Sequence, residues 1–304
     1  AERRIFMKYA RLFRFLTDER KEQIQKVIDA LRMGGRSEKT IDNYVHAIYR
    51  FIKYFESKDI SKFDEDNIIE YVKNNYLKKS CAGNTYNMNV SAIKFFYSIN
   101  FKKEFNKKLL PHAKITKRLP STIDKETFIK ILNGEQNLKH KCWLLLAYCS
   151  GLRAEEVASI RIKDINANEH ELKVLGKRKK ERFTFLPDIT IKYLRLYYKS
   201  YYCKIFSPKQ NKTGYLFEGS QGAEHINSGT IVNYFTTLKS KYKLDESLTF
   251  HSLRHSFASN FIKANGDPFV LKSMMGHSSL NTTSIYIHMG RDFNNLKGVN
   301  YEQI

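Results

Sequence analysis

The sequence HSLRHSF, residues 251–257, places two imidazoles and a guanidinium within five residues. Residues three apart on a helix share one side, so His251 and Arg254 would face the same ligand. The planar fork of Arg254 suits two phosphate oxygens, and the backbone N–H groups at a helix start also attract an anion. The motif therefore indicates an anion site, although by itself it is more typical of an arginine paired with a core carboxylate beside a histidine cap.

Two further cations lie where they can reach a ligand. Arg153, in GLRAEEVASI, follows a helix and a glycine, so it would point into a cleft at a helix–helix corner. A surface salt bridge with Glu155 or Glu156 is the more common fate of such an arginine. Lys177, in LGKRKKER, lies at the tip of an expected hairpin, where it would reach into a nucleic-acid groove, donate a proton or simply stay solvated.

Two more residues indicate a function only in combination with the others. His277 follows the apolar stretch FVLKSMM and a glycine, a place where histidine is more often structural, and Tyr286 is one of 19 tyrosines. Together, two arginines, two histidines and a lysine can hold one phosphodiester and stabilise a pentavalent transition state. A tyrosine phenol, with a pKa of about 10, could then attack phosphorus if cations and a base assist it. The phosphotyrosine ester would store the bond energy of the broken strand, so resealing would need no ATP. A lysine would protonate the 5′ oxygen that leaves.

The charge of the chain indicates which polyanion carries this phosphate. Lys and Arg number 53 against 31 Asp and Glu, a net charge of +22, which favours nucleic acid over an anionic membrane. No run of about 18 apolar residues exists, and the basic, amphipathic N-terminus AERRIFMKYARLFRFL lacks the apolar block of a signal peptide. The four cysteines, at 81, 142, 149 and 203, form no CxxC pair, which indicates reduced thiols in an intracellular protein.

Helical periodicity dominates the elements that must position these residues. Hydrophobic residues make up 42% of the chain, which is enough for packed cores. The spacing predicts an all-helical first unit with helices over 21–32, 37–55 (capped by Ser37), 64–77 and 84–100. Residues 106–124 hold two of the five prolines and a run of cations, which is typical of a linker lying along a phosphate backbone.

Beyond the linker, helices frame one small sheet. Asp124 caps a helix, and Gly151 ends the apolar helix that contains CWLLLAYCS. Residues 171–187 alternate apolar and polar side chains around a basic centre, which predicts a β-hairpin. Further helices are predicted over 188–202, 227–242, 252–264 and 267–275. The fold class is therefore mainly α with a small β-hairpin or sheet.

These motifs, in this order, resemble the active-site set of the tyrosine recombinase family, also called phage-type integrases. The matching features are Arg in GLRAEE, Lys in a β-hairpin, His-x-x-Arg in HSLRHSF, Gly-His in MGHSS and a Tyr nine residues after that His. The resemblance covers residues 120–290 closely and the helical first unit more loosely. Within the family, the wording is most similar to the bacterial Xer subgroup and related mobile-element recombinases.

The resemblance implies a two-domain DNA clamp. Its parts would be an N-terminal extension (1–20), a helical SAM-like core-binding domain (21–108), an interdomain linker (109–123), a catalytic domain (124–290) and a C-terminal tail (291–304). Tyr286 would be the nucleophile and form a 3′-phosphotyrosyl link, while Arg153 and Arg254 clamp the scissile phosphate. Lys177 would be the general acid.

The remaining matched residues would support this chemistry. His251 and His277 would assist phosphate binding and proton handling, and Glu156 would support the network around them. Contacts with the DNA backbone are expected from cations of the hairpin and the linker, namely Arg178, Lys179, Lys180, Lys114, Lys117 and Arg118.

The implied activity is site-specific DNA recombination, by cleavage and rejoining of strands without metal, ATP or another cofactor. The partner would be a double-stranded recombination site with inverted half-sites, bound by one dimer per site and by a homo-tetramer on paired sites. The tail would dock on a neighbouring subunit. We expect a cytoplasmic, nucleoid-associated bacterial protein without membrane contact. An activating accessory protein stays open, as does the choice between mobile-element excision or integration and chromosome-dimer resolution.

Three other functions fit part of the sequence. A non-catalytic DNA-binding protein could retain the fold and the charge, but the presence of all six polar positions argues against such decay. His251, His255 and His277 could serve a zinc protein or a metal-dependent nuclease, yet no carboxylate cluster accompanies them in the sequence. A type IB topoisomerase would share the chemistry but not the separate helical first unit.

Overall fold

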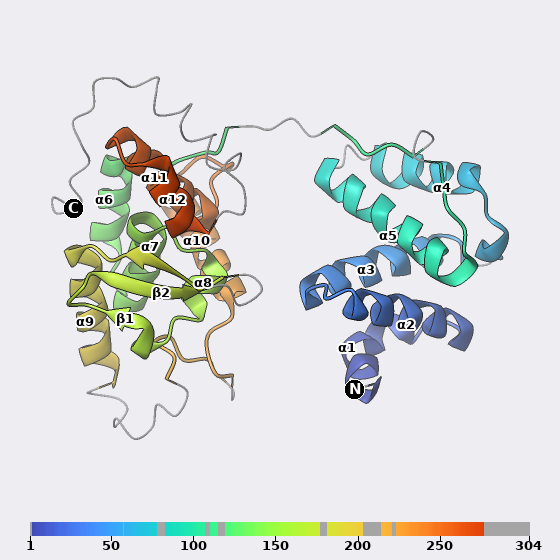
Figure 1. Cartoon of the computed structure of the whole chain (residues 1–304), viewed down its shortest axis with the longest axis horizontal. Helices are drawn as coiled ribbons and strands as arrows, with labels where there is room; N and C mark the ends of the chain where they lie inside the picture. The colour runs from blue at the N-terminus through green and yellow to red at the C-terminus, as the bar shows by residue number, and fades with distance from the viewer. Residues whose placement is uncertain are drawn as a thin grey trace. The chain divides into compact units, whose positions relative to one another are not determined.

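The computed structural model describes residues 2–56, 58–77, 83–106, 110–114, 119–176, 181–202, 214–220 and 223–276, and the side chains within them apart from those of 2–7 and 77. It divides into two compact units, Ala1–Lys117 and Arg118–Ile304, which Figure 1 shows. Helices dominate both units, and one three-stranded sheet lies in the second. The predicted fold class, mainly α with a small sheet, is confirmed.

Five α-helices make up the described part of the first unit. They are α1 (Glu2–Phe13), α2 (Asp18–Met33), α3 (Glu38–Tyr54), α4 (Glu65–Val72) and α5 (Gly83–Phe101). A 3₁₀ turn, Ile60–Lys62, precedes α4, and a π turn, Lys73–Leu77, continues it. The four helices predicted here are present, but the one expected over 64–77 keeps α-helical hydrogen bonding only to Val72.

Helix α3 lies at the centre of the first core because its apolar residues recur on one face. Ser37 caps this helix by accepting a hydrogen bond from the Thr40 N–H at 3.2 Å, as predicted. Phe51 is fully buried, and the rings of Tyr71 and Tyr97 meet it edge-on. Helices α2 and α5 pack against α3 and against each other, so one aromatic-rich core holds the unit together.

The N-terminal helix α1 is bound to this core. Tyr9 and Phe13 are buried in it, and the Tyr9 hydroxyl donates a hydrogen bond to Asp42. The Lys8 ammonium lies 2.6 Å from the same carboxylate. Arg11, an exposed cation of its last turn, lies on the opposite side of the helix. The amphipathic pattern of the N-terminus therefore produces a helix that adds to the first unit.

The second unit packs helices against one face of its small sheet, and the other face is exposed. The strands β1 (Ile165–Asn166), β2 (Glu171–Leu175) and β3 (Glu181–Phe185) pair antiparallel in that order, with Lys173 opposite Phe183. The predicted hairpin is confirmed, and its tip at 177–180 lies outside the described residues. The helices are α6 (Lys125–Gly134), α7 (Leu138–Ser150), α8 (Ala154–Ala158), α9 (Asp188–Tyr202), α10 (Ser228–Lys241), α11 (Phe250–Lys263) and α12 (Pro268–Met275).

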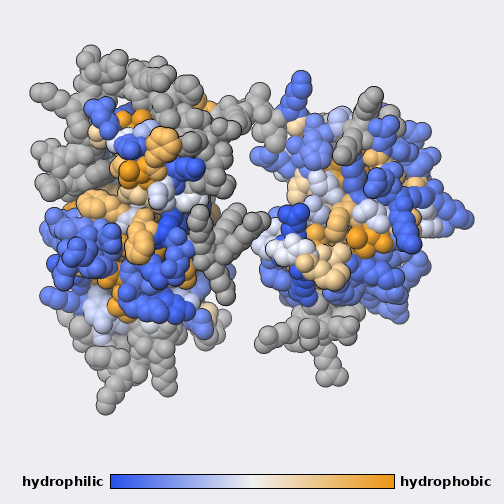
Figure 2. Space-filling model, viewed as in Figure 1, coloured by the Kyte–Doolittle hydropathy of each residue, from blue (hydrophilic) through white to orange (hydrophobic). Residues whose placement is uncertain are grey.

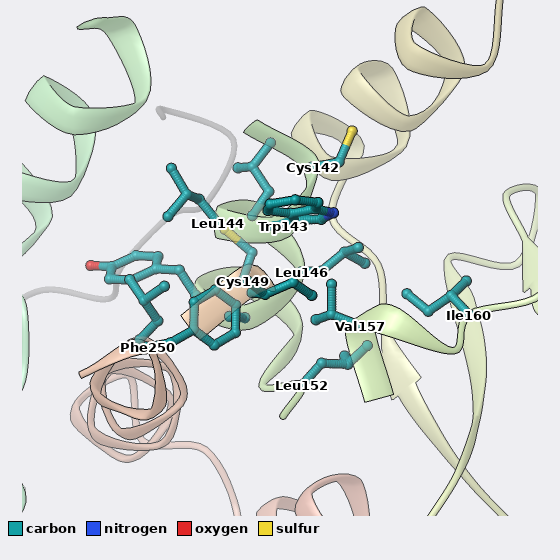
Figure 3. Close-up of a cluster of buried hydrophobic side chains, with 14 of the residues drawn as sticks. Cys142, Trp143, Leu144, Leu146, Cys149, Leu152, Val157, Ile160 and Phe250 are labelled. Atoms are coloured by element: carbon teal, nitrogen blue, oxygen red, sulfur yellow. The ribbon is translucent and has the colours of Figure 1, made fainter. Parts of the chain in front are cut away.

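Helix α7 is the buried axis of this unit. Its residues from Cys142 to Ser150 are all buried, and α9 and α11 pack against it. Figure 3 shows side chains of α7, including Trp143 and Leu146, gathered with Val157 of α8 and Phe250 of α11. Burial raises the pKa of the Cys149 thiol to about 12, so this cysteine behaves as an apolar core residue.

A sharp turn at Gly151 carries the chain from this core into the site. Gly151 ends α7 in the left-handed region, with φ 68°, as its position in the sequence predicts. A Cβ at this position would lie 2.5 Å from the ring of Phe257, so a larger residue would clash with α11. The glycine thus permits both the turn and the close approach of α11, and Arg153 follows two residues later.

Candidate active site

Glu156 lies at the centre of a buried cluster of cations. It is the third residue of α8 and is only 6% exposed. Its Oε2 accepts the backbone N–H of Arg153 at 2.8 Å, and its Oε1 accepts Arg153 Nη1 at 2.8 Å. The carboxylate therefore caps the start of α8 and fixes the direction of the Arg153 side chain, whose exposed fraction is 31%.

A second arginine grips the same carboxylate from the sheet. Arg182 of β3 donates from Nη1 to Glu156 Oε1 at 2.7 Å and from Nη2 to Oε2 at 2.8 Å. Sequence reasoning missed this residue. The apolar alternation in ERFTF favours the opposite face, because it would bury Phe183 and Phe185, whereas the structure exposes both rings and buries Arg182 and Thr184. A charged residue at an inward strand position needs a buried partner.

Arg254 approaches the cluster from α11. It is 1% exposed and lies with Nη1 3.7 Å from Glu156 Oε2. Its Nη1 donates to the Gly151 carbonyl, and its Nη2 donates to the Met275 carbonyl at 2.5 Å. The guanidinium thus lies where α7 and α12 end, beside the carboxylate that orients Arg153.

The electrostatics of Glu156 follow from these three guanidiniums. Burial alone would raise its pKa, but the hydrogen bonds and charge of Arg182, the Arg153 N–H and the charge of Arg254 outweigh burial and lower the pKa to about 2. The carboxylate is therefore ionised throughout the physiological pH range. One negative charge faces three positive ones, so the cluster keeps a positive excess that favours an anion.

His251 lies at the exposed rim of the cluster, in the first turn of α11. Desolvation by the surrounding protein is the main cause that lowers the pKa of His251 to about 4. The charges of Arg254 and Arg153 also lower this pKa, and the charge of Glu156 acts in the opposite direction. The imidazole is neutral at neutral pH. The interpretation of His251 as the helix cap is wrong, because Thr249 occupies that position and its N–H bonds Ser252 Oγ at 3.0 Å.

The structure brings four of the predicted site residues together, namely Arg153, Glu156, His251 and Arg254. The ion pair of Arg153 with Glu156 exists, but it is largely buried instead of being a surface bridge. Lys114 is exposed in the first unit. The other predicted site residues lie outside the described ranges: Lys177, His277, Tyr286, Arg178, Lys179, Lys180, Lys117 and Arg118.

The helix before His277 ends beside this cluster. Gly276 closes α12 with φ 63°, and the preceding carbonyls of Met274 and Met275 accept hydrogen bonds from Arg182 Nε and Arg254 Nη2.

Across the described ranges, no three His, Cys, Asp or Glu side chains gather closely enough to hold a metal ion. Nor does any helix in them have the length and apolarity needed to cross a membrane.

Two family models match the chain, one in each of its two units. The profile of the Phage integrase family matches residues 122–291, and that of the phage integrase N-terminal SAM-like domain matches residues 24–107. The chain belongs to the phage integrase family. It is therefore a tyrosine recombinase, an enzyme of the class that transfers DNA strands in site-specific recombination, as the sequence motifs predict.

Curated relatives of this tyrosine recombinase align with most of its length. Tyrosine recombinase XerD of Staphylococcus haemolyticus is 27% identical over 268 residues, which cover 84% of this chain and 90% of the relative. Tyrosine recombinase XerC of Actinobacillus succinogenes is 29% identical over 298 residues, which cover 92% and 96% of the two chains.

Solved structures show the same fold at lower identity. XerH site-specific recombinase bound to palindromic difH substrate has a TM-score of 0.69 at 21% identity, covering 89% of this chain and 82% of that one. A lambda integrase dimer bound to a COC′ core site has a TM-score of 0.68 at 16% identity, covering 96% and 83%. Two-domain recombinases are thus the structural neighbours of this chain.

Proposed function

We propose that the cluster around Glu156 binds the scissile phosphate of a DNA recombination site. The observation that carries this proposal is the positive excess of three guanidiniums around one buried carboxylate, with Arg153 at its open side. Preorganised cations of this kind stabilise the charge that develops on phosphate oxygens in the transition state. Arg153 and Arg254 would contact those oxygens, and neutral His251 would exchange a hydrogen bond or a proton with them.

The strand exchange then follows from residues matched to the family motifs. The Tyr286 oxygen attacks phosphorus and loses its proton to a nearby base, with His277 assisting. The bond from phosphorus to the 5′ oxygen breaks, and Lys177 protonates that oxygen. A 3′-phosphotyrosyl link remains, and attack by the 5′ hydroxyl of a second strand restores the DNA backbone and the phenol. No metal or cofactor enters these steps.

Basic surfaces on both units support binding of the duplex. Among the described residues, hydrophilic side chains cover large parts of both units on the face shown in Figure 2, and the chain carries a net charge of +22. Cations of the hairpin tip and of the linker predicted at 109–123 would hold the backbone: Arg178, Lys179, Lys180, Lys114, Lys117 and Arg118. The linker would join the core-binding domain at 21–108 to the catalytic domain at 124–290.

The assembly proposed for this recombinase is a dimer on each site and a homo-tetramer on two paired sites. The neighbours bound to a palindromic substrate and, as a dimer, to a core site support inverted half-sites for this chain as well. The tail at 291–304 would dock on the next subunit through Val299, Tyr301 and Ile304. The bacterial relatives named as Xer recombinases and as an integrase/recombinase support action on bacterial DNA in the cytoplasm.

The decisive experiment traps the covalent intermediate. In a DNA site with a nick just beyond the cleavage position, cleavage releases a short fragment that carries the 5′ hydroxyl. The strand cannot be resealed, so the protein stays joined to the 3′ end. We expect the wild-type chain to accumulate this complex in the presence of EDTA, and Tyr286→Phe to bind the same DNA with nearly unchanged affinity but form none. Wild-type protein that binds DNA without ever forming the complex would support the non-catalytic alternative.

A further inference from the structure

Arg182 joins three segments that meet around the proposed phosphate site. It lies on β3, is 8% exposed and uses both Nη atoms on Glu156. Its Nε donates to the Met274 carbonyl in the last turn of α12 at 2.7 Å. Helix α12 packs on β3, and a Cβ placed on Gly276 would come within 2.9 Å of Arg182 Cδ. The side chain is thus enclosed between the sheet and the end of α12.

The contacts of Arg182 decide how the charge of Glu156 is used. A carboxylate next to two phosphate-binding arginines would normally cancel part of their charge, because opposite charges a few ångströms apart in a buried site interact strongly. Arg182 takes both oxygens of Glu156 in a bidentate pair, the strongest geometry available to these two groups. Glu156 can then orient Arg153 and lie near Arg254 while its negative charge is balanced from the sheet.

The same contacts fix the ends of two segments. β3 leads back to the hairpin tip with Lys177, and α12 leads directly to His277. The Arg182 side chain extends from β3 and bonds both Glu156 of α8 and the end of α12, so it holds these three segments in one arrangement. Loosening of such a support by about 1 Å is enough to slow a positioned reaction by roughly a hundredfold.

We propose that Arg182 is a positioning residue of the recombinase, which balances Glu156 so that Arg153 and Arg254 keep their charge for the scissile phosphate. This inference rests on the proposed function of the cluster. It assigns Arg182 no contact with DNA. Arg182 therefore acts on the rate of cleavage and not on the affinity for the site.

The test compares Arg182→Gln, Arg182→Lys and the double variant Arg182→Gln/Glu156→Gln with the wild-type chain. The rate of covalent complex formation on saturating nicked DNA and the Kd for the same DNA are both measured. We expect Arg182→Gln to lower the rate by about a hundredfold with Kd within about threefold, and Arg182→Lys to recover part of the rate. Arg195→Gln, at an exposed arginine of α9, is the control and should leave both values unchanged.

The double variant separates charge balance from simple support. If Arg182 acts by balancing Glu156, the double variant should form the covalent complex at least tenfold faster than Arg182→Gln alone. A double variant as slow as the single one, or slower, would overturn the inference, as would Arg182→Gln at the wild-type rate. Should Arg182→Gln fail to unfold cooperatively, the rate of Arg182→Lys decides: a wild-type rate overturns the inference. A wild-type chain that never traps DNA would refute the proposed function itself, which is a distinct result.

Discussion

The two units of the molecule carry the same net charge but place it differently. Residues 1–117 contain 25 Lys and Arg against 14 Asp and Glu, and residues 118–304 contain 28 against 17, so each has a net charge of +11. No charged side chain is buried in the described part of the first unit. In the second, Glu156, Arg182 and Arg254 are all buried.

This difference separates two uses of positive charge. Exposed cations interact with phosphates through high-dielectric solvent, so each contributes a small, salt-sensitive part of the affinity. Buried cations lose their water and need partners, and in return they are held in one geometry at which a transition state can form. We therefore expect substitutions in the buried cluster to change the rate of chemistry and substitutions of exposed cations to change binding.

The largest effect is expected from Arg254→Ala. The variant loses a guanidinium of the proposed phosphate clamp and leaves the buried carbonyls of Gly151 and Met275 without this donor. We expect the rate of covalent complex formation to fall by about a thousandfold, with DNA affinity reduced far less. Arg195→Ala, at an exposed site in the same unit, should cleave normally. A folded Arg254→Ala protein that cleaves within tenfold of wild type would contradict the assignment of Arg254.

The next effect concerns acid stability and Glu156. Its folded-state pKa of about 2 lies below the ordinary value of 4.5, so the unfolded chain binds more protons between these values. The stabilisation is fully present above pH 4.5 and is lost as the pH falls toward 2. Its size is about 3 kcal/mol, from the shift in pKa. Denaturant unfolding at several pH values should show Glu156→Gln less stable than wild type at pH 7, with the two converging toward pH 2. Parallel curves would indicate that the ionised carboxylate contributes nothing.

The buried cluster also shows what the sequence could and could not predict. Local signals gave correct elements: the Asp124 cap, the left-handed turn at Gly151 and the period-two hairpin are each set by a few neighbouring residues. The role of Arg182 depends on strand register and on a carbonyl 92 residues away, so no local pattern encodes it. Helix α11 begins at Phe250, two residues before the predicted start, because the Phe250 side chain is buried and Thr249 supplies the cap.

The π turn that follows α4 was missed for a related reason. No glycine or proline interrupts the residues from Glu65 to Leu77, so the apolar spacing alone predicts a continuous helix. Buried rings instead determine the local backbone, since Tyr71 and Tyr76 both lie in the core with their hydroxyls 3.2 Å apart. Tertiary packing overrides periodicity here, as long-range contacts do at Arg182.

The smallest effect is expected where charge is exposed, at Lys114 of the first unit. Lys114→Ala should weaken DNA binding by less than about tenfold at moderate salt and lower the slope of log Kd against log salt by about 1, because one phosphate contact releases about one counterion. The rate of cleavage at saturating DNA should not change. Lys26→Ala is the matched control, since Lys26 is exposed on α2 and already pairs with Glu22 at 2.8 Å. A cleavage defect in Lys114→Ala at saturating DNA would show that the first unit takes part in the chemistry, and the division between binding charge and catalytic charge would fail.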